Sequence, residues 1–227
     1  MNAPLIEAHG LRKRFRGPAV DVDALVGLDL LVRAGEVVGL LGGNGAGKST
    51  TLRILATVLP ADGGQARIAG HDVATEAMAA RARLGYVSQA GGVDDHVTGR
   101  QNLVFQGRLH GLDRRAVAGR AGDLLDGFGL TPIADTSPRT WSGGQRRRLA
   151  LALGLVHRPQ VLLLDEPTVG LDPPAKAALW QRVADLAATG AAVLLSTHDI
   201  EEANRLCHRR LTIERGALAS ATGPSAW

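Results

Sequence analysis

A glycine-rich segment near residue 45 has the residue types and spacing that bind phosphate. Residues 42–49 read Gly-Gly-Asn-Gly-Ala-Gly-Lys-Ser and match the pattern G-x-x-x-x-G-K-[ST]. Glycines let the backbone wrap closely around a phosphate, and a helix that starts at the segment's end presents free N–H groups to the anion. The predicted phosphate site consists of Gly42, Gly43, Asn44, Gly45, Ala46, Gly47, Lys48, Ser49 and Thr50.

Four side chains are expected to carry the chemistry. Lys48 is placed to reach the terminal phosphates, and the Ser49 hydroxyl is a ligand suited to Mg²⁺. Asp165 and Glu166 end an apolar run, and two adjacent acids at the end of a buried strand are costly unless they meet a cation or polar chemistry. We therefore expect Asp165 to ligate Mg²⁺ and Glu166 to act as the general base for an attacking water.

Short strand and helix patterns alternate along the chain, which predicts an α/β fold with a mostly parallel sheet. Strands are expected near residues 37–41, 161–164, 193–195 and 211–213, and helices near 48–59, 173–188 and 200–206. Residues 5–32 are β-rich, whereas the middle of the chain has helical patterns without strand signals. We expect a core of residues 5–90 and 156–218, an inserted helical part at 91–155 and a lightly packed tail at 219–227.

Composition limits the possible partners. The 227 residues suit one compact domain, and the net charge of +4 comes mainly from arginines scattered among 22 acidic residues, so no nucleic-acid partner is expected. The arginines at 146–148 are interpreted as a solvated helix face. No secretory signal and no run of about 18 apolar residues is evident, so we expect a soluble chain that reaches a membrane only through a partner.

The segment at residues 141–145 indicates which kind of phosphate-loop protein this is. Residues 141–145, Trp-Ser-Gly-Gly-Gln, resemble the signature motif of ATP-binding cassette (ABC) proteins, commonly Leu-Ser-Gly-Gly-Gln, and precede the acid pair as in that family. Gln89 resembles the family's Q-loop, residues 170–172 its D-loop and residues 196–199 its H-loop. Phe15 resembles the aromatic residue that stacks on adenine, with Val22 on the same face. The resemblance covers residues 5–218, although Trp141, Gly43 and Phe15 replace the usual leucine, proline and tyrosine.

The resemblance implies a single ABC ATPase domain over residues 1–227. Its fold would be a P-loop NTPase core of the RecA type, with an N-terminal antiparallel β subdomain and an inserted α-helical subdomain. The implied cofactors are ATP and Mg²⁺, with Ser49, Gln89 and Asp165 as metal ligands. The implied catalytic residues are Glu166, His198, Gln89 and Lys48.

The signature segment predicts a second anion site. A serine cap and two glycines leave free N–H groups at the start of a helix, and one phosphate loop already holds one triphosphate. In the family this helix faces the ATP of a second subunit. The resemblance therefore implies that this second nucleotide is contacted by Ser142, Gly143, Gly144 and Gln145.

Residues 97–103 and 197–203 resemble segments of drug- and antibiotic-export cassettes. They imply an exporter with a separate transmembrane permease, a second cassette in a homodimer or heterodimer, and a place on the cytoplasmic face of the membrane. The surface near residues 89–95 would receive the permease, with Asp94 and Asp95 as test positions.

Three alternatives remain at this point. The first is a soluble ABC ATPase acting on nucleic acid or the ribosome, which would usually have a coiled-coil insert or a tandem cassette. The second is a binding-only regulatory subunit, against which Glu166 and His198 argue. The third is a P-loop enzyme of another kind, such as a nucleotide kinase, which would leave residues 142–145 unexplained.

Overall fold

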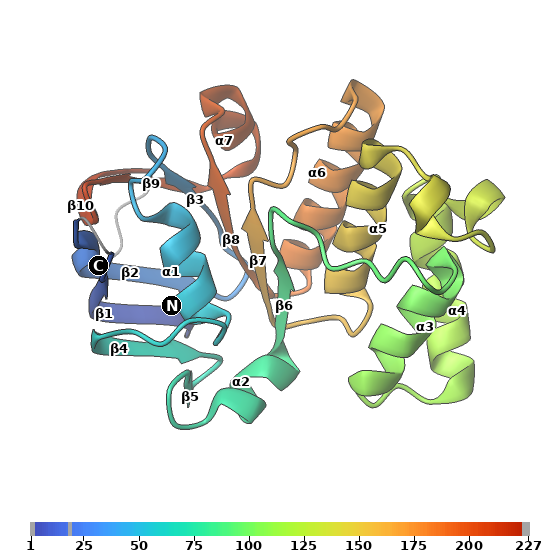
Figure 1. The fold of residues 1–227 in the computed structure, drawn as a ribbon, viewed down its shortest axis with the longest axis horizontal. Coiled ribbons are helices and arrows are strands. Elements are labelled where there is room, and N and C mark those ends of the chain that lie inside the picture. Colours follow the sequence, from blue (N-terminus) through green and yellow to red (C-terminus); the bar gives the residue numbers. More distant parts are fainter. Residues whose placement is uncertain (1–2, 18–19, 224–227) are drawn as a thin grey trace.

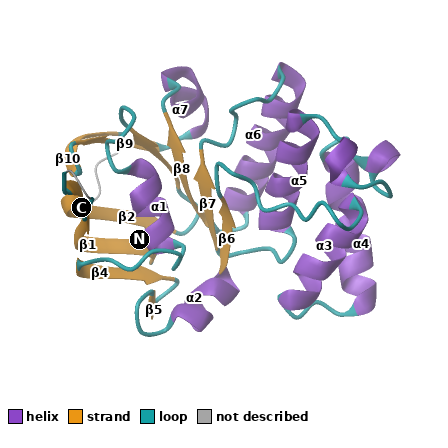
Figure 2. Cartoon of the chain, viewed as in Figure 1, coloured by secondary structure: helices purple, strands orange, loops and turns teal. Residues whose placement is uncertain are grey.

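The computed structural model describes residues 3–17 and 20–223, which form two β-sheets flanked by helices (Figure 1, Figure 2). The strands are β1 Pro4–Phe15, β2 Val22–Arg33, β3 Val37–Leu41, β4 Gly63–Ile68, β5 His71–Asp72, β6 Leu84–Val87, β7 Val161–Asp165, β8 Ala192–Thr197, β9 Arg209–Glu214 and β10 Ala217–Thr222. The α-helices are α1 Lys48–Leu55, α2 Ala77–Arg83, α3 Gly99–Leu109, α4 Arg114–Gly127, α5 Gly143–Leu155, α6 Pro173–Ala188 and α7 Ile200–Leu206. Short 3₁₀ turns occupy Thr131–Ile133 and Pro138–Thr140.

The larger sheet has the strand order β10-β9-β3-β8-β7-β6. All of its neighbouring strands are parallel except β9 and β10, which form an antiparallel hairpin. Its central strands are buried on both faces, so they are nearly continuous apolar runs such as Val161–Asp165. The prediction of an α/β fold with a mostly parallel sheet is confirmed.

The smaller sheet has the order β2-β1-β4-β5 and is antiparallel throughout. It lies beside α1 at one end of the molecule (Figure 1). The antiparallel arrangement expected for the N-terminal part of the chain is therefore present.

Two apolar cores lie on the two faces of the parallel sheet. Leu162 and Leu164 of β7 point into one core, whereas Val161 and Leu163 point into the other, as the two-residue period of a strand requires. One core joins this sheet to α1 and the antiparallel sheet, and the other joins it to α5, α6 and the helical region. Both cores thus converge on the strands whose ends carry the candidate chemistry.

The helical region lies beyond the edge strand β6 (Figure 1). Its helices α3 and α4 and the start of α5 pack around Leu103, Phe128, Trp141 and Leu149. Further along, α5 packs against β6. This helix therefore runs from the helical region into the core.

The structure differs from the sequence expectations in detail at two element ends. Helix α1 ends at Leu55 rather than near residue 59, because Thr57 has a left-handed backbone (φ 60°) that breaks the helical path. Residues 219–222 of the expected tail 219–227 belong to β10, and all four are exposed to solvent, so this part of the tail is lightly packed but forms a strand. The reason is a two-residue turn at Arg215 and Gly216, whose φ values of 49° and 80° suit a tight hairpin. Residues 224–227 of that tail lie outside the described residues.

Within the part of the chain that the structure describes, no helix combines the length and the apolar character needed to cross a lipid bilayer.

Candidate functional site

The phosphate-binding segment forms a loop between β3 and α1, as its sequence pattern predicts. Gly47 occupies the N-cap position of α1 and offers no side-chain cap, so the first N–H groups of the helix are left for another acceptor. Gly47 has φ 112°, and a Cβ atom there would lie 2.7 Å from the carbonyl oxygen of Ala24. Only glycine fits this position, and the loop is consequently held open as an anion cradle.

Lys48 is held beneath this loop. Its Nζ donates hydrogen bonds to the carbonyl oxygens of Gly42 at 2.8 Å and Gly43 at 3.2 Å. It also lies 3.7 Å from Oε1 of Glu166, and both side chains are buried. The ammonium group of Lys48 and the carboxylate of Glu166, which follows β7, therefore lie next to each other at the base of one site.

Asp165 is fixed by two hydroxyl groups from different elements. Ser49 Oγ donates to Asp165 Oδ1 at 2.9 Å, and Ser196 Oγ donates to the same oxygen at 2.6 Å. The donors come from α1 and β8, and the acceptor from the end of β7. Parallel strands end at one edge of a sheet, which explains how residues so distant in sequence meet.

Glu166 has an unusual backbone that turns its side chain into the site. Successive strand residues point to opposite faces, so Asp165 and Glu166 would diverge in a regular strand. Glu166 instead has φ 48°, and its N–H donates to Ser196 Oγ at 3.0 Å. Its Oε2 lies 2.8 Å from Nδ1 of His198. Strain of this kind is found at functional sites, and here it turns Glu166 into the cavity, whereas Asp165 lies buried behind Ser49.

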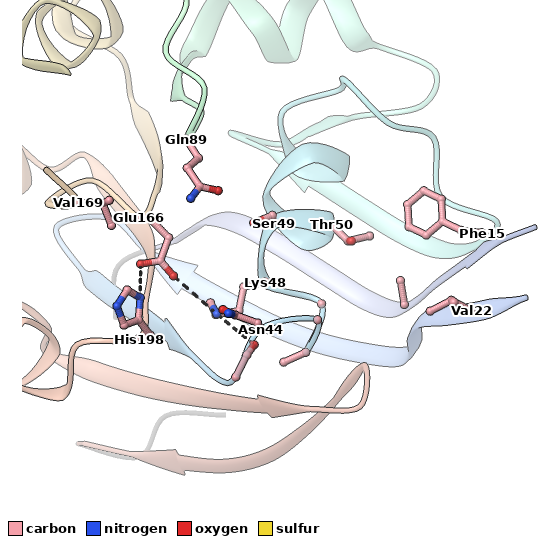
Figure 3. A pocket seen from close by; sticks show the side chains of 15 residues that line it. Phe15, Val22, Asn44, Lys48, Ser49, Thr50, Gln89, Glu166, Val169 and His198 are labelled. Carbon is pink, nitrogen blue, oxygen red and sulfur yellow. Dashed lines mark hydrogen bonds and ion pairs between the residues drawn. The ribbon is translucent and has the colours of Figure 1, made fainter. Parts of the chain in front are cut away.

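One cavity of about 580 Å³ collects most of the predicted residues (Figure 3). In Figure 3, Phe15 and Val22 lie at one end, Glu166 and His198 at the other, and the phosphate loop between them. Gln89 enters the Glu166 end from the segment that follows β6. The full lining is Phe15, Val22, Ala24, Gly43, Asn44, Gly45, Ala46, Gly47, Lys48, Ser49, Thr50, Gln89, Glu166, Val169 and His198.

The expected metal ligands fit Mg²⁺ by their chemistry. Ser49, Asp165 and Gln89 offer a hydroxyl, a carboxylate and an amide oxygen, which are the hard donors that Mg²⁺ prefers. Ser49 and Asp165 are already within hydrogen-bond distance of each other, and Gln89 lines the same cavity as Ser49. These three side chains lie beside the phosphate loop and would hold the ion there, where its charge would offset that of the phosphates.

The signature segment is not part of this cavity. Ser142 and Gln145 form a reciprocal capping box at the start of α5, with Ser142 N donating to Gln145 Oε1 at 2.7 Å and Gln145 N donating to Ser142 Oγ at 3.2 Å. Ser142 and Gly143 are exposed to solvent. Within a single chain, the start of α5 is therefore separate from the cavity that contains the phosphate loop.

The expectation that residues 146–148 form a solvated helix face was wrong. Arg147 is only 9% exposed, Arg146 forms an ion pair with Asp95, and Arg148 Nη1 donates to the carbonyl oxygen of Phe128 at 2.9 Å. A signal was available, because Ala150 and Leu151 lie three and four residues after Arg147, on the same face of an otherwise apolar helix. Sequence reasoning also missed Ser196, whose hydroxyl contacts both Asp165 and the backbone of Glu166.

Comparison with known proteins agrees with this geometry. A family model described as ABC transporter matches residues 25–169. The chain is 48% identical over 214 residues to the daunorubicin/doxorubicin resistance ATP-binding protein DrrA of Streptomyces peucetius, covering 94% of this chain and 63% of that protein. It is 44% identical over 214 residues to the Nod factor export ATP-binding protein I of Paraburkholderia xenovorans, covering 94% and 69% respectively. The chain thus spans less than two thirds of the DrrA protein.

Solved structures show the same fold. An ATP-binding subunit of an ABC transporter superimposes with a TM-score of 0.90 at 27% identity, covering 97% of this chain and 90% of that one. A dimeric ATP-binding cassette in a post-hydrolysis state with ADP and Pi has a TM-score of 0.90 at 24% identity, covering 98% of this chain and all of its own. The phosphate loop, the paired acids and these matches lead to one conclusion: the chain belongs to the ABC transporter family and has the fold of its ATP-binding cassettes.

Proposed function

We propose that this chain binds Mg²⁺-ATP, hydrolyses it and thereby drives export through a separate membrane permease. The observation that carries the proposal is the convergence of Lys48, Glu166 and His198 around the open end of the phosphate loop. A site that only bound nucleotide would need the loop and Lys48 but no positioned carboxylate. The presence of both parts supports hydrolysis.

In the proposed complex, ATP lies along the cavity from Phe15 to Glu166. Phe15 stacks on adenine, the loop N–H groups and Thr50 bind the phosphates, and Lys48 neutralises the terminal ones. Ser49, Asp165 and Gln89 hold Mg²⁺, which when bound neutralises the charge on the terminal phosphate oxygens.

Glu166 is the proposed general base. Its carboxylate accepts a proton from water as the water oxygen attacks the γ-phosphorus, and the bond from that phosphorus to the β-phosphate oxygen breaks to leave ADP. His198 orients the carboxylate through its contact with Oε2, and its exposed ring is available to the γ-phosphate. Gln89 faces the same space and is the proposed link to the permease side.

A second cassette is proposed to complete the site. The start of α5 presents Ser142 and Gly143 to solvent, outside the cavity of its own chain. In a head-to-tail pair, Ser142 to Gln145 of each copy would bind the ATP held by the other, and two nucleotides would be enclosed. The partner can be a second copy or a related cassette.

Export is proposed from the relatives. Their names describe ATP-binding proteins of drug resistance and of Nod factor export. The permease would select the cargo and hold this chain at the cytoplasmic face of the membrane. The surface at residues 89–95 remains the proposed permease contact, with one change: Asp95 is unsuited as a test position, because it pairs with Arg146 and holds the helical region together.

The proposal is tested by ATP hydrolysis of the wild type and its Glu166→Gln variant, alone and with the permease. Removing the base is expected to lower the rate about a hundredfold or more while ATP still binds. Glu201→Gln is the matched control, since this exposed acid lies just outside the site on α7. Unchanged rates in Glu166→Gln would remove Glu166 as the base, and a wild type inactive even with its permease would leave a binding-only subunit.

A further inference from the structure

The most densely bonded side chain outside the ATP cavity is that of Arg147. Its guanidinium group is buried, and its hydrogen-bond partners are main-chain carbonyl oxygens. Nη2 donates to the carbonyls of Asp165 and Glu166, both at 2.8 Å. Nη1 donates to the carbonyl of Ser88 at 2.6 Å and Nε to that of Pro167 at 3.3 Å, with Gln89 O at 3.4 Å from Nη1.

These carbonyls belong to the two segments that carry the proposed hydrolytic residues. Ser88 and Gln89 follow β6, and residues 165–167 are the last residue of β7 and the two residues after it. Strands β6 and β7 are parallel neighbours, so their ends lie side by side. One guanidinium thus bridges the main chain of Gln89 and that of Glu166, whose left-handed turn places its carbonyl within reach.

The third element in this arrangement is α5 itself. Arg147 lies four residues after Gly143, within the same 13-residue helix. A helix of this length moves as a rigid body, so a displacement of its N-terminus is transmitted to Arg147. That N-terminus is the segment proposed to bind the nucleotide of a second cassette.

The charge of Arg147 makes this link hard to replace. A guanidinium has five N–H donors in a fixed planar fork, whereas lysine offers a single point charge and glutamine one amide. Burial lowers the pKa of Arg147, while the negative charges of Asp165 and Glu166 act in the opposite direction. The positive charge of Arg147 is therefore stabilised by the carbonyl dipoles that it contacts and by the nearby negative charges of Asp165 and Glu166.

We propose that Arg147 is a positioning residue that couples the two ATP sites of the cassette pair, because it joins the α5 N-terminus to the main chain of Gln89 and Glu166. Nucleotide bound by one copy at the start of α5 would shift the helix, and Arg147 would transmit the shift to the base and the glutamine of its own site. The inference rests on the proposed function and adds to it a route for cooperativity between the two sites.

The test compares Arg147→Lys and Arg147→Gln with Arg148→Gln in the same cassette and permease preparation. Arg148 is the matched control, because it lies on the same helix but contacts only the carbonyl of Phe128 in the helical region. ATP affinity, the maximal rate, the Hill coefficient and the thermal midpoint are measured for each protein. The ATP affinity reports on the phosphate loop, and the thermal midpoint reports on the stability of the fold. The maximal rate reports on the positioning of Glu166 and Gln89, and the Hill coefficient reports on coupling between the two ATP sites.

Both Arg147 variants are expected to bind ATP within about threefold of wild type, to lose at least about tenfold in maximal rate and to show a Hill coefficient near 1. Arg148→Gln should keep the wild-type values. A folded Arg147 variant with unchanged rate and Hill coefficient would overturn the proposal, as would an equal loss in Arg148→Gln.

Failure of the proposed function has a different signature. If the wild type does not hydrolyse ATP even with its permease, the proposed ATPase function is wrong, and the coupling role of Arg147 that rests on it is rejected as well. A wild type that hydrolyses ATP with a Hill coefficient near 1 keeps the proposed function and overturns only the coupling. If Arg147→Lys does not fold, Arg147→Gln decides the outcome; if neither folds while Arg148→Gln does, Arg147 is a structural anchor and the coupling role is rejected.

Discussion

At the scale of single residues, Phe15 is the one phenylalanine, tyrosine or tryptophan among the described residues that line the cavity, and it is 42% exposed. Replacing it with alanine should weaken ATP binding about tenfold, since stacking of a base on an aromatic ring is worth roughly 1–3 kcal/mol. The maximal rate should persist at saturating ATP, because Phe15 lies at the end of the cavity away from Glu166. Equilibrium titration with nucleotide gives the affinity, and Phe15→Tyr should bind as the wild type does. Equal affinity in Phe15→Ala would place adenine elsewhere.

Glu202 is a buried acid next to the His198 segment. Thr197 Oγ1 donates to Glu202 Oε2 at 2.6 Å and accepts from the N–H of Asp199 at 3.0 Å, so the two hydrogen bonds flank His198. Burial is the main cause that raises the pKa of Glu202 from its ordinary value of 4.5, against the lowering effect of Thr197, Thr168 and Trp180. Its contribution to stability is complete below pH 4.5 and is lost as pH rises through the higher folded-state pKa.

Glu202→Gln should therefore gain stability relative to the wild type as pH increases. The amide keeps the acceptor for Thr197 and has no charge to bury. Urea unfolding at pH 5 and pH 8 measures this, and the difference in free energy of unfolding between variant and wild type should be more positive at pH 8. The same difference at both values would mean that the carboxyl titrates normally.

At the scale of elements, the helical region is built around the contact between Trp141 and Gly99. The Trp141 ring is buried against the start of α3, where a Cβ atom on Gly99 would overlap it, and Trp141 Nε1 donates to Thr136 Oγ1 at 2.8 Å. The tryptophan that replaces the family's usual leucine is thus accommodated by a glycine on the facing helix. The two positions should be energetically coupled.

Gly99→Ala in the wild type should cost about 1–3 kcal/mol through overpacking, and Trp141→Leu on the order of 2 kcal/mol through the cavity and the lost hydrogen bond. The double variant should cost less than the sum by about 1 kcal/mol, because leucine leaves room for the alanine methyl. Urea unfolding of the four proteins tests this. Gly119→Ala on α4 is the control, since a Cβ there meets open space, and additive costs would exclude the contact.

At the scale of the whole molecule, the phosphate loop and the start of α5 lie at separate places, and the proposed function brings them together only in a pair of cassettes. Gly143→Asp puts a carboxylate at the signature helix start, where a Cβ meets nothing within 4 Å, so it should repel phosphate without disturbing the fold. Lys48→Ala should remove nucleotide binding at the loop. Each variant alone should be inactive.

Mixed in equal amounts, the two variants should recover a measurable rate of at most about a quarter of the wild-type rate, and less where the proposed coupling slows a dimer with one intact site. Random pairing makes half of the dimers mixed, and each mixed dimer has one site with an intact loop from one copy and an intact signature from the other. Hydrolysis of the mixture is measured against each variant alone. No recovery in a mixture shown to form mixed dimers would mean that both elements act on one nucleotide within a chain.

The sequence determined the features that contiguous residues create. The phosphate loop and its helix lie within residues 42–55, and their function follows from local backbone geometry and the helix N-terminus, so the spacing alone predicted them. The apolar runs that end in Asp165 and Glu166 likewise indicated buried parallel strands. The capping box at Ser142 is also local, and the helix start was predicted correctly for that reason.

Only the tertiary structure decided what depends on residues that are distant in sequence. The burial of Arg147 requires the ends of β6 and β7 to meet α5, and the two serine hydroxyls on Asp165 come from positions 116 residues before it and 31 after it. Residues 219–222 of the expected tail pair with β9 as part of β10, and these small residues have no apolar pattern of their own that would predict a strand. Side-chain type and spacing determine local structure, whereas contacts between residues that are distant in sequence depend on the strand order and on how the elements pack.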